Sequence, residues 1–338
     1  MKLIQEESFV FDDLLIVPQY SDVASRSDVS TRVEIAGMQL EIPIIAANMD
    51  TICGPKMARA MHELGGLGIM HRFAEADQRI IWVGNLKDDG VYAVPSVGLG
   101  TQALDELNAF FNAGADAVCI DVAHGNCKKM HDLVDEFYSK RVNNDRHLII
   151  GNFTSVNDNF IPSHLDNITW KIGIGPGSAC ETRVVAGVGM PQASAIMNCR
   201  KHMPYMYAPL IADGGIKKPA DVAKAIGLGA SAVMVGGYIA FTDEVPDLGR
   251  ETYRGMASGA AQIEHSGRIS NGVPEGKSFM ASGEAPGSVV DKVNELVGGL
   301  RSAMSYTGAH NVLEYQNKVI FQRVTPATST ENIAHFGK

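Results

Sequence analysis

The chain has 338 residues, of which 45% are hydrophobic and 20% are charged, and its formal net charge is −9. This acidic balance, with a pI near 5.6 and no lysine- or arginine-rich tract, does not favour binding to nucleic acid. No apolar run approaches the ~20 residues that span a bilayer, and the five cysteines form neither a CxxC pair nor an even, regularly spaced set. We therefore expect a cytoplasmic protein with no membrane and no nucleic-acid partner.

Apolar, β-branched runs recur along the chain after an irregular start, and most of them are followed by a helical pattern. Residues 1–40 predict an N-terminal arm without regular structure. Eight candidate strands follow, at Ile42–Ala47, Leu67–Met70, Tyr92–Val97, Ala117–Asp121, Leu148–Gly151, Thr169–Ile174, Leu210–Ala212 and Ala232–Val235. Helical patterns between them include Pro55–Leu64, Gln102–Ala113, Met130–Tyr138 and Ala220–Leu228. This alternation predicts an α/β protein of the (β/α)8 TIM-barrel type, with one domain over residues 1–338.

The ends of the predicted strands distinguish a barrel from a doubly wound sheet. The last two strands lead into glycine pairs, Asp213-Gly214-Gly215 and Gly236-Gly237, as at the phosphate-binding end of a barrel. A doubly wound sheet usually has its glycines after the first strand instead, where this chain has Asn48-Met49-Asp50-Thr51. Residues 254–287, rich in glycine and serine, predict a long C-terminal active-site flap. A helical pattern at Ser288–Tyr306 and a strand-like segment at Lys318–Val324 come last.

A loop with three closely spaced glycines follows the sixth predicted strand and contains a single cysteine, Cys180. Such a loop presents backbone N–H and C=O groups that can hold a phosphate or a cation. Nearby N–H groups also favour a thiolate. At the carboxyl end of a barrel strand, Cys180 is therefore a candidate nucleophile, and Thr182 is close enough to pass it a proton. The alternative is a glycine-rich turn with an incidental cysteine.

Three carboxylates lie at strand ends or in the flap. Asp213 precedes two glycines, a pattern that suits binding of ribose hydroxyls beside a phosphate. Asp121 ends the fourth strand in a similar way. His124 follows it, and a loop histidine without a role is as good an interpretation of His124 as a site residue. Glu275 is either a solvated loop residue or a general acid/base that a closing flap brings beside Thr182.

These motifs, in this order, resemble the family of inosine-monophosphate dehydrogenases and guanosine-monophosphate reductases. The resemblance covers nearly the whole chain, through FDDLLIVP, IPIIAANMDT, GIMHRF, DVAHG, KIGIGPGSACETR, IADGGI, VMVGG, YRGMAS and GGLRSAMSYTGA. It implies a (β/α)8 barrel that assembles as a homotetramer. It also implies that the loop cysteine attacks C2 of the purine and forms a covalent thioimidate.

Residue by residue, the resemblance implies that Cys180 is the nucleophile and that Thr182 and Glu275 relay protons. A monovalent cation, potassium, would be held by the carbonyls of Gly175, Gly177 and Cys180. Nucleotide binding is implied for Ser178, Asp213, Gly214, Gly215, Gly236, Gly237, Tyr253, Gly255, Met256 and Gly276. Cofactor binding is implied for Asp121, Val122, Ala123 and Gly175, and for Ser25 and Arg26 toward the cofactor of a neighbouring subunit.

Two reactions divide this family: NADPH-dependent reduction of GMP to IMP with release of ammonia, and NAD-dependent oxidation of IMP to XMP. The dehydrogenases usually insert regulatory cystathionine-synthase-type domains after the second strand, where this chain has only about 20 residues between Met70 and Tyr92. They also carry an Arg-Tyr pair that activates water, and no such pair lies between Met256 and Glu275. The sequence thus favours the reductase. Val273-Pro274-Glu275-Gly276 is closer to dehydrogenases, so a dehydrogenase without regulatory domains stays the alternative, with a catalytically silent nucleotide-binding protein third.

Overall fold

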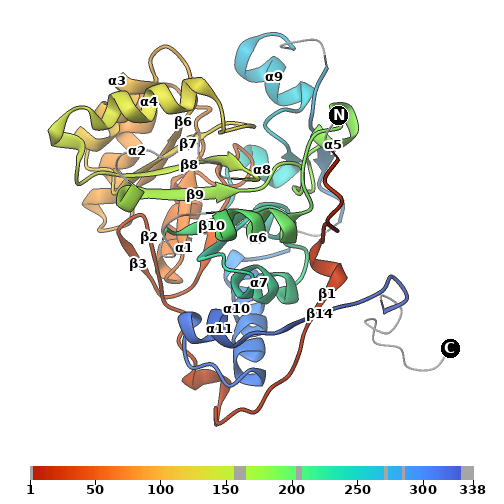
Figure 1. Cartoon of the computed structure of the whole chain (residues 1–338). Helices are drawn as coiled ribbons and strands as arrows, with labels where there is room; N and C mark the ends of the chain where they lie inside the picture. Colours follow the sequence, from red (N-terminus) through yellow and green to blue (C-terminus); the bar gives the residue numbers. More distant parts are fainter. Residues whose placement is uncertain (1–2, 156–164, 203–207, 270–272, 284–285, 329–338) are drawn as a thin grey trace.

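The computed structural model describes residues 3–155, 165–202, 208–269, 273–283 and 286–328. Eight parallel strands close into a barrel in the order β10-β11-β4-β5-β6-β7-β8-β9, with helices around it (Figure 1). The barrel strands are β4 (Ile44–Ala46), β5 (Leu67–Met70), β6 (Val94–Val97), β7 (Ala117–Asp121), β8 (His147–Phe153), β9 (Ile168–Ile172), β10 (Leu210–Asp213) and β11 (Ala232–Val235). All eight expected strands form, so the predicted (β/α)8 fold is confirmed.

The barrel strands were recognisable because they are buried on both faces. Every residue of β4, β5, β6 and β11 is buried. One face of each strand lies inside the barrel and the other lies under the helices, so the sequence shows continuous apolar runs instead of alternation. Two of the polar residues in these strands, Asp121 and Asp213, are the last residues of β7 and β10, at the carboxyl ends of the strands.

The surrounding helices include α1 (Pro55–Glu63), α2 (Ala76–Asp88), α3 (Ala103–Asn112), α4 (Lys128–Tyr138), α6 (Gln192–His202), α7 (Pro219–Gly227) and α10 (Val289–Tyr306). The last of these shows how the sequence specifies them. Ser288 caps α10, where its side chain accepts a hydrogen bond from the Val290 N–H. Val293, Leu296, Val297 and Leu300 then recur at helical spacing and are buried, and α10 packs against α7. None of the helices in the described ranges is long and apolar enough to cross a bilayer.

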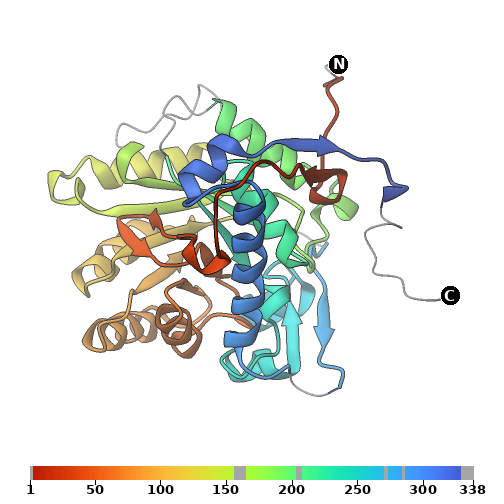
Figure 2. The same ribbon diagram turned by 90° about the horizontal axis from the view of Figure 1, so that it is seen from below.

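The N-terminal arm is more regular than its sequence indicated. Two of its strands, β2 (Val33–Ile35) and β3 (Met38–Leu40), form an antiparallel hairpin. A third, β1 (Leu14–Ile16), pairs antiparallel with β14 (Phe321–Arg323), so a segment near the start of the chain lies beside one near its end (Figure 2). The expectation of an irregular arm was wrong at these strands, because three residues are too few to show a period. The expected strand at Lys318–Val324 is confirmed in the shorter form β14, after a helix that the sequence did not indicate, α11 (Val312–Lys318).

The flap also contains regular structure. It begins with β12 (Thr252–Arg254), continues through α9 (Gly259–Ser266), and returns through β13 (Ser278–Met280), which pairs antiparallel with β12. Ser258 caps α9, and Gly267 ends it with a left-handed conformation that favours glycine. The expected long loop is therefore a helix carried on a two-stranded ribbon. Two further short helices, α5 (Thr182–Val185) and α8 (Asp247–Glu251), complete the set, and Figure 1 shows α5 and α9 on the side of the barrel toward which β9 points.

Candidate active site

A cavity of about 300 Å³ opens at the carboxyl ends of the barrel strands. Many of the residues that the sequence indicated lie on its wall, namely Asp121, Val122, Ala123, Gly175, Gly177, Cys180, Thr182, Asp213, Tyr253, Gly255, Met256 and Glu275. The structure thus brings the three expected catalytic residues to one cavity, in the place where barrel enzymes have their active sites.

The loop after β9 holds Cys180 at this cavity. Glycine is required within the loop, since a Cβ on Gly173 would lie 2.2 Å from a backbone oxygen and a Cβ on Gly175 would lie 2.6 Å from the Arg183 side chain. The Sγ of Cys180 lies 3.3 Å from the Oγ1 of Thr182, within reach for proton transfer.

The cysteine at the cavity differs from the buried ones. Cys180 is partly exposed, whereas Cys53 and Cys119 are buried, and burial raises the pKa of both thiols well above the usual range. A thiol that stays protonated is a poor nucleophile. The environment therefore favours Cys180 over these two as the reactive thiol, as the sequence predicted.

The flap docks directly on the cysteine loop. Gly276 forms an antiparallel bridge with Cys180, and the Lys277 N–H donates to the Ala179 carbonyl at 3.0 Å. On the other side of the bridge, the Glu181 N–H donates to the carbonyl of Glu275 at 2.8 Å. This pairing fixes the register of the flap, so that Glu275 joins the cavity wall with Cys180 and Thr182. The sequence predicted the approach of Glu275, but it gave no sign of the strand-like pairing that produces it.

Next to the cavity, glycine turns from three neighbouring strands converge. A Cβ on Gly237 would lie 2.6 Å from the Ser178 hydroxyl, and a Cβ on Gly214 would lie 3.0 Å from the Gly177 nitrogen. The Ser178 hydroxyl is also 3.0 Å from the Tyr253 hydroxyl, and burial raises the pKa of this phenol. Gly215 and Gly236 stand beside these residues in the same two turns, and backbone N–H groups in such turns suit a phosphate.

A buried lysine that was not assigned a role lies beneath the cavity. The Nζ of Lys171 is 2.7 Å from the Oδ1 of Asp121 and 2.6 Å from the Oδ2 of Asp213, and it also donates to the Asn152 side chain. Burial opposes the charged form of Lys171, but the two carboxylates outweigh it and raise its pKa. Burial likewise raises the pKa of Asp121, and the lysine reverses this to a net lowering. The signal in the sequence was a single lysine inside a buried apolar strand, because an unpaired lysine is almost never buried.

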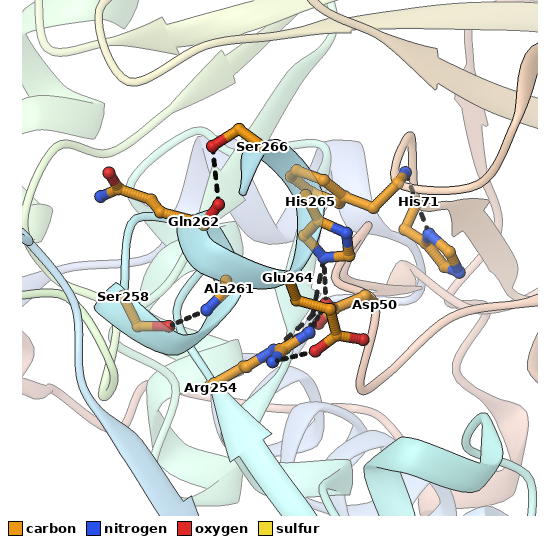
Figure 3. Close-up of polar contacts among 10 residues, drawn as sticks. Asp50, His71, Arg254, Ser258, Ala261, Gln262, Glu264, His265 and Ser266 are labelled. Carbon is orange, nitrogen blue, oxygen red and sulfur yellow. Dashed lines mark hydrogen bonds and ion pairs between the residues drawn. The ribbon is translucent and has the colours of Figure 1, made fainter. Parts of the chain in front are cut away.

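A second buried ion cluster fixes the start of the flap (Figure 3). Asp50 follows β4, and its Oδ2 accepts hydrogen bonds from the Nη2 of Arg254 at 2.5 Å and from the Nε2 of His265 at 2.7 Å. The side chains of Asp50 and Arg254 are each only 4% exposed. Arg254 also pairs with Glu264 at 2.7 Å, and the His265 ring stacks on Phe73 with centroids 4.4 Å apart. These contacts tie α9 to the barrel and hold Arg254 in place between Tyr253 and Gly255.

Ser25 and Arg26, which were expected at the cofactor of a neighbouring subunit, do not line the cavity of this chain. Ser25 and Arg26 are exposed in the N-terminal arm, where Ser25 caps a 3-10 turn and the Arg26 guanidinium lies 5.9 Å from the centre of the Tyr306 ring. Their role toward a neighbouring subunit stays a prediction.

For a cation, the described residues contain no cluster of three or more His, Cys, Asp or Glu side chains that could hold a metal ion. The backbone carbonyl oxygens of the cysteine loop are therefore the groups that could bind a cation near Cys180. The carbonyl of Gly177 already accepts the Cys180 N–H at 3.0 Å, which leaves it one lone pair for an ion.

Comparison with known proteins identifies the family. The family model described as the IMP dehydrogenase / GMP reductase domain matches residues 8–335. An inosine-5'-monophosphate dehydrogenase of Cryptosporidium parvum is 32% identical over 388 aligned positions, which cover 97% of this chain and 95% of that protein. A GMP reductase of Leishmania donovani is 27% identical over 483 positions, which cover 97% of each. The crystal structure of a cysteine-to-alanine variant of GMP reductase from Trypanosoma brucei, in complex with guanosine 5'-monophosphate, superimposes with a TM-score of 0.86 at 26% identity, over 98% of both chains.

Chain length does not separate the two branches of this family. The alignment with the L. donovani reductase has 483 positions against 338 residues here, so a relative named as a reductase also contains extra residues. Conversely, this chain covers almost all of the C. parvum dehydrogenase. The short connection between Met70 and Tyr92 therefore carries no weight in choosing the reaction. What the family model and the relatives do establish is that the chain belongs to the IMP dehydrogenase / GMP reductase family of oxidoreductases.

Proposed function

We propose that the protein catalyses the NADPH-dependent reduction of GMP to IMP with release of ammonia. The observation that carries this proposal is the docking of the flap on the cysteine loop, which brings Glu275 to the same cavity wall as Cys180 and Thr182. Expulsion of an amine needs an acid near the leaving nitrogen. Hydrolysis by a dehydrogenase needs a base that activates water, and no Arg-Tyr pair stands between Met256 and Glu275 to serve as one.

The chemistry follows from the positions of these groups. The thiolate of Cys180 attacks C2 of the guanine and forms a C–S bond, while the ring nitrogen takes the displaced electron pair. Collapse of this adduct breaks the C2–N bond, and the amino group leaves as ammonia with a proton relayed from Glu275 through Thr182. When bound, NADPH supplies the hydride that adds to C2 of the resulting thioimidate. The C–S bond then breaks, IMP is released, and Cys180 leaves as a thiolate.

Binding roles are proposed for the residues around the cavity. The phosphate of the nucleotide would lie on the glycine turns beside Ser178, and Asp213 would accept hydrogen bonds from the ribose hydroxyls. Asp121 to Ala123 would face the nicotinamide, and the carbonyls of the cysteine loop would hold a potassium ion. We further propose a homotetramer that acts in the cytoplasm, in which Ser25 and Arg26 reach the cofactor bound to a neighbouring subunit.

Oxidation of IMP to XMP with NAD is the second candidate. It is favoured by the sequence Val273-Pro274-Glu275-Gly276 and by the 32% identity to a dehydrogenase, against 27% to the L. donovani reductase. Under this reading Glu275 would act as a base for water.

One experiment separates the candidates. The purified protein is given GMP with NADPH, GMP with NADH, or IMP with NAD, and the absorbance of the reduced nicotinamide is followed. We expect oxidation of NADPH with GMP and formation of IMP and ammonia. Reduction of NAD with IMP, without turnover of GMP, would assign the dehydrogenase instead. Turnover in none of the mixtures, with intact nucleotide binding, would indicate a silent nucleotide-binding protein.

A further inference from the structure

Four neighbouring barrel strands contribute to one polar cluster. Asp121 on β7, Asn152 on β8, Lys171 on β9 and Asp213 on β10 lie on strands that follow one another in the barrel. The ammonium group of Lys171 donates to all three partners, which uses its three N–H groups completely. The Lys171 side chain is 2% exposed, whereas each carboxylate is 22% exposed on the cavity wall. The cation therefore lies beneath two carboxylates that can still reach a ligand.

Stability alone does not account for this cluster. Taking charges out of water is costly, and well-packed apolar residues in place of a buried ion cluster are often at least as stable. A buried ammonium group between two carboxylates at a ligand cavity therefore points to a role toward the ligands. The two carboxylates are the residues that the proposed function places on different ligands, Asp121 on the cofactor and Asp213 on the nucleotide.

Other groups also face these carboxylates. The Arg72 guanidinium and the Asn48 amide stabilise ionised Asp121 from the loops after β5 and β4, and the thiol of Cys119 lies close by on β7. Asp213 accepts a second hydrogen bond, at 2.8 Å, from the Asn152 amide, and its negative charge contributes to raising the pKa of the Tyr253 hydroxyl, which also lines the cavity. Lys171 is the one cation among the described residues that forms an ion pair with both carboxylates.

We propose that Lys171 is a positioning residue that holds Asp121 and Asp213 side by side as carboxylates and thereby links the cofactor site to the nucleotide site. The proposal rests on the proposed function for the assignment of the two ligands. Two carboxylates that both contact one nitrogen are close enough to repel, and without the cation one of them takes up a proton at neutral pH. A protonated Asp213 loses an acceptor for the ribose. A protonated Asp121 loses the negative charge beside the nicotinamide.

The test compares three proteins: wild type, Lys171→Met, and Lys171→Met combined with Asp121→Asn. Calorimetry measures the binding of GMP and of IMP without cofactor from about pH 5.5 to about pH 8.5, where an unperturbed aspartate stays ionised. The ratio of variant to wild-type Kd cancels the titration of the nucleotide phosphate. Lys171→Met should weaken binding about tenfold or more at neutral pH, and the loss should shrink as the pH rises and the shared proton leaves. The double variant should bind within about threefold of the wild type, because Asp213 no longer faces a second negative charge.

A urea titration gives a readout without any ligand. In Lys171→Met the pKa of one carboxylate would be higher in the folded than in the unfolded chain. The folded state then binds the extra proton, so its stability relative to the wild type should fall as the pH rises through the raised pKa. Asp121→Asn should remove this fall.

The outcomes are distinct. A loss of nucleotide binding that is equal at every pH and is not restored by Asp121→Asn would overturn the proposal, since a merely structural role predicts that result. Wild-type protein that binds neither GMP nor IMP would refute the proposed function, while the urea titration would still decide whether Lys171 keeps both carboxylates ionised. If Lys171→Met does not fold, Asp121→Asn alone decides: GMP affinity should stay within about threefold while NADPH affinity falls about tenfold or more, and equal effects on both ligands would overturn the proposal.

Discussion

Replacing Gly276 by alanine should slow catalysis without unfolding the protein, because the added methyl group disrupts the backbone pairing between the flap and the cysteine loop. A Cβ at this position would lie 2.9 Å from the Ser258 nitrogen and 3.2 Å from the Ala179 oxygen. Both are backbone atoms of segments that pair with Gly276, one within the flap and one in the cysteine loop, so neither can move away without disturbing this pairing. Two hydrogen bonds flank that bridge, Lys277 N–H to Ala179 and Glu181 N–H to Glu275.

If both hydrogen bonds are lost at about 1 kcal/mol each, the docked flap is destabilised by about 2 kcal/mol, which corresponds to roughly a 30-fold change in its equilibrium. Where turnover requires Glu275 at the cavity, kcat for GMP with NADPH should fall by about 10- to 30-fold. GMP affinity measured by calorimetry should change much less, since the glycine turns that face the phosphate are untouched. Gly298→Ala is the matched control, because a Cβ there meets nothing within 4 Å, and kcat should be unchanged. Wild-type kcat in Gly276→Ala would refute the view that the docked flap is needed for turnover.

Three further predictions concern the chemistry and the assembly. Cys180→Ala should abolish turnover while calorimetry still detects GMP binding, and appreciable activity in this variant would exclude the covalent mechanism. Glu275→Gln should slow release of ammonia in single turnovers by about 10²-fold or more; Lys277→Ala, which breaks only an ion pair whose lysine is 62% exposed, should change it less than about twofold. Light scattering should show a homotetramer, and a fully active monomer at the same concentration would contradict a cofactor site shared through Arg26.

The barrel could be predicted from the sequence because its signals are local. A strand such as β5 or β11 is a continuous apolar run that ends in a glycine turn or a loop, and both runs have the predicted bounds. The arm and the flap escaped prediction for the opposite reason. Strands of three residues and a two-turn helix such as α9 are too short to show a period, and they depend on partners far along the chain for their stability.

The same distinction divides the candidate site. Cys180 and Thr182 were indicated by spacing within one loop, and the structure finds their side chains 3.3 Å apart. Asp50 contacts Arg254, which is 204 positions away in the sequence, and His265, which is 215 positions away, so no local sequence pattern predicts these contacts. Lys171 lies between these cases, because its position inside a buried strand is visible in the sequence and its two carboxylate partners become known only from the fold.

The two reactions of this family differ in whether a proton is given to a leaving amine or taken from water. Because both can take place in the same barrel cavity, the fold does not determine which reaction the protein catalyses. In the proposed mechanism both would begin with a thiolate at C2, and both would need the nucleotide and the nicotinamide at the same cavity. The difference is whether the group beside Thr182 gives a proton to a leaving amine or takes one from water. We propose Glu275 for that group, and a docked flap would also limit the access of water to the carbon that bears sulfur. A flap that stays paired with the cysteine loop throughout the cycle suits deamination. A hydrolytic step would use the same carboxylate as a base for water and would also need the flap paired at Gly276, so Gly276→Ala should slow whichever of the two reactions the protein catalyses.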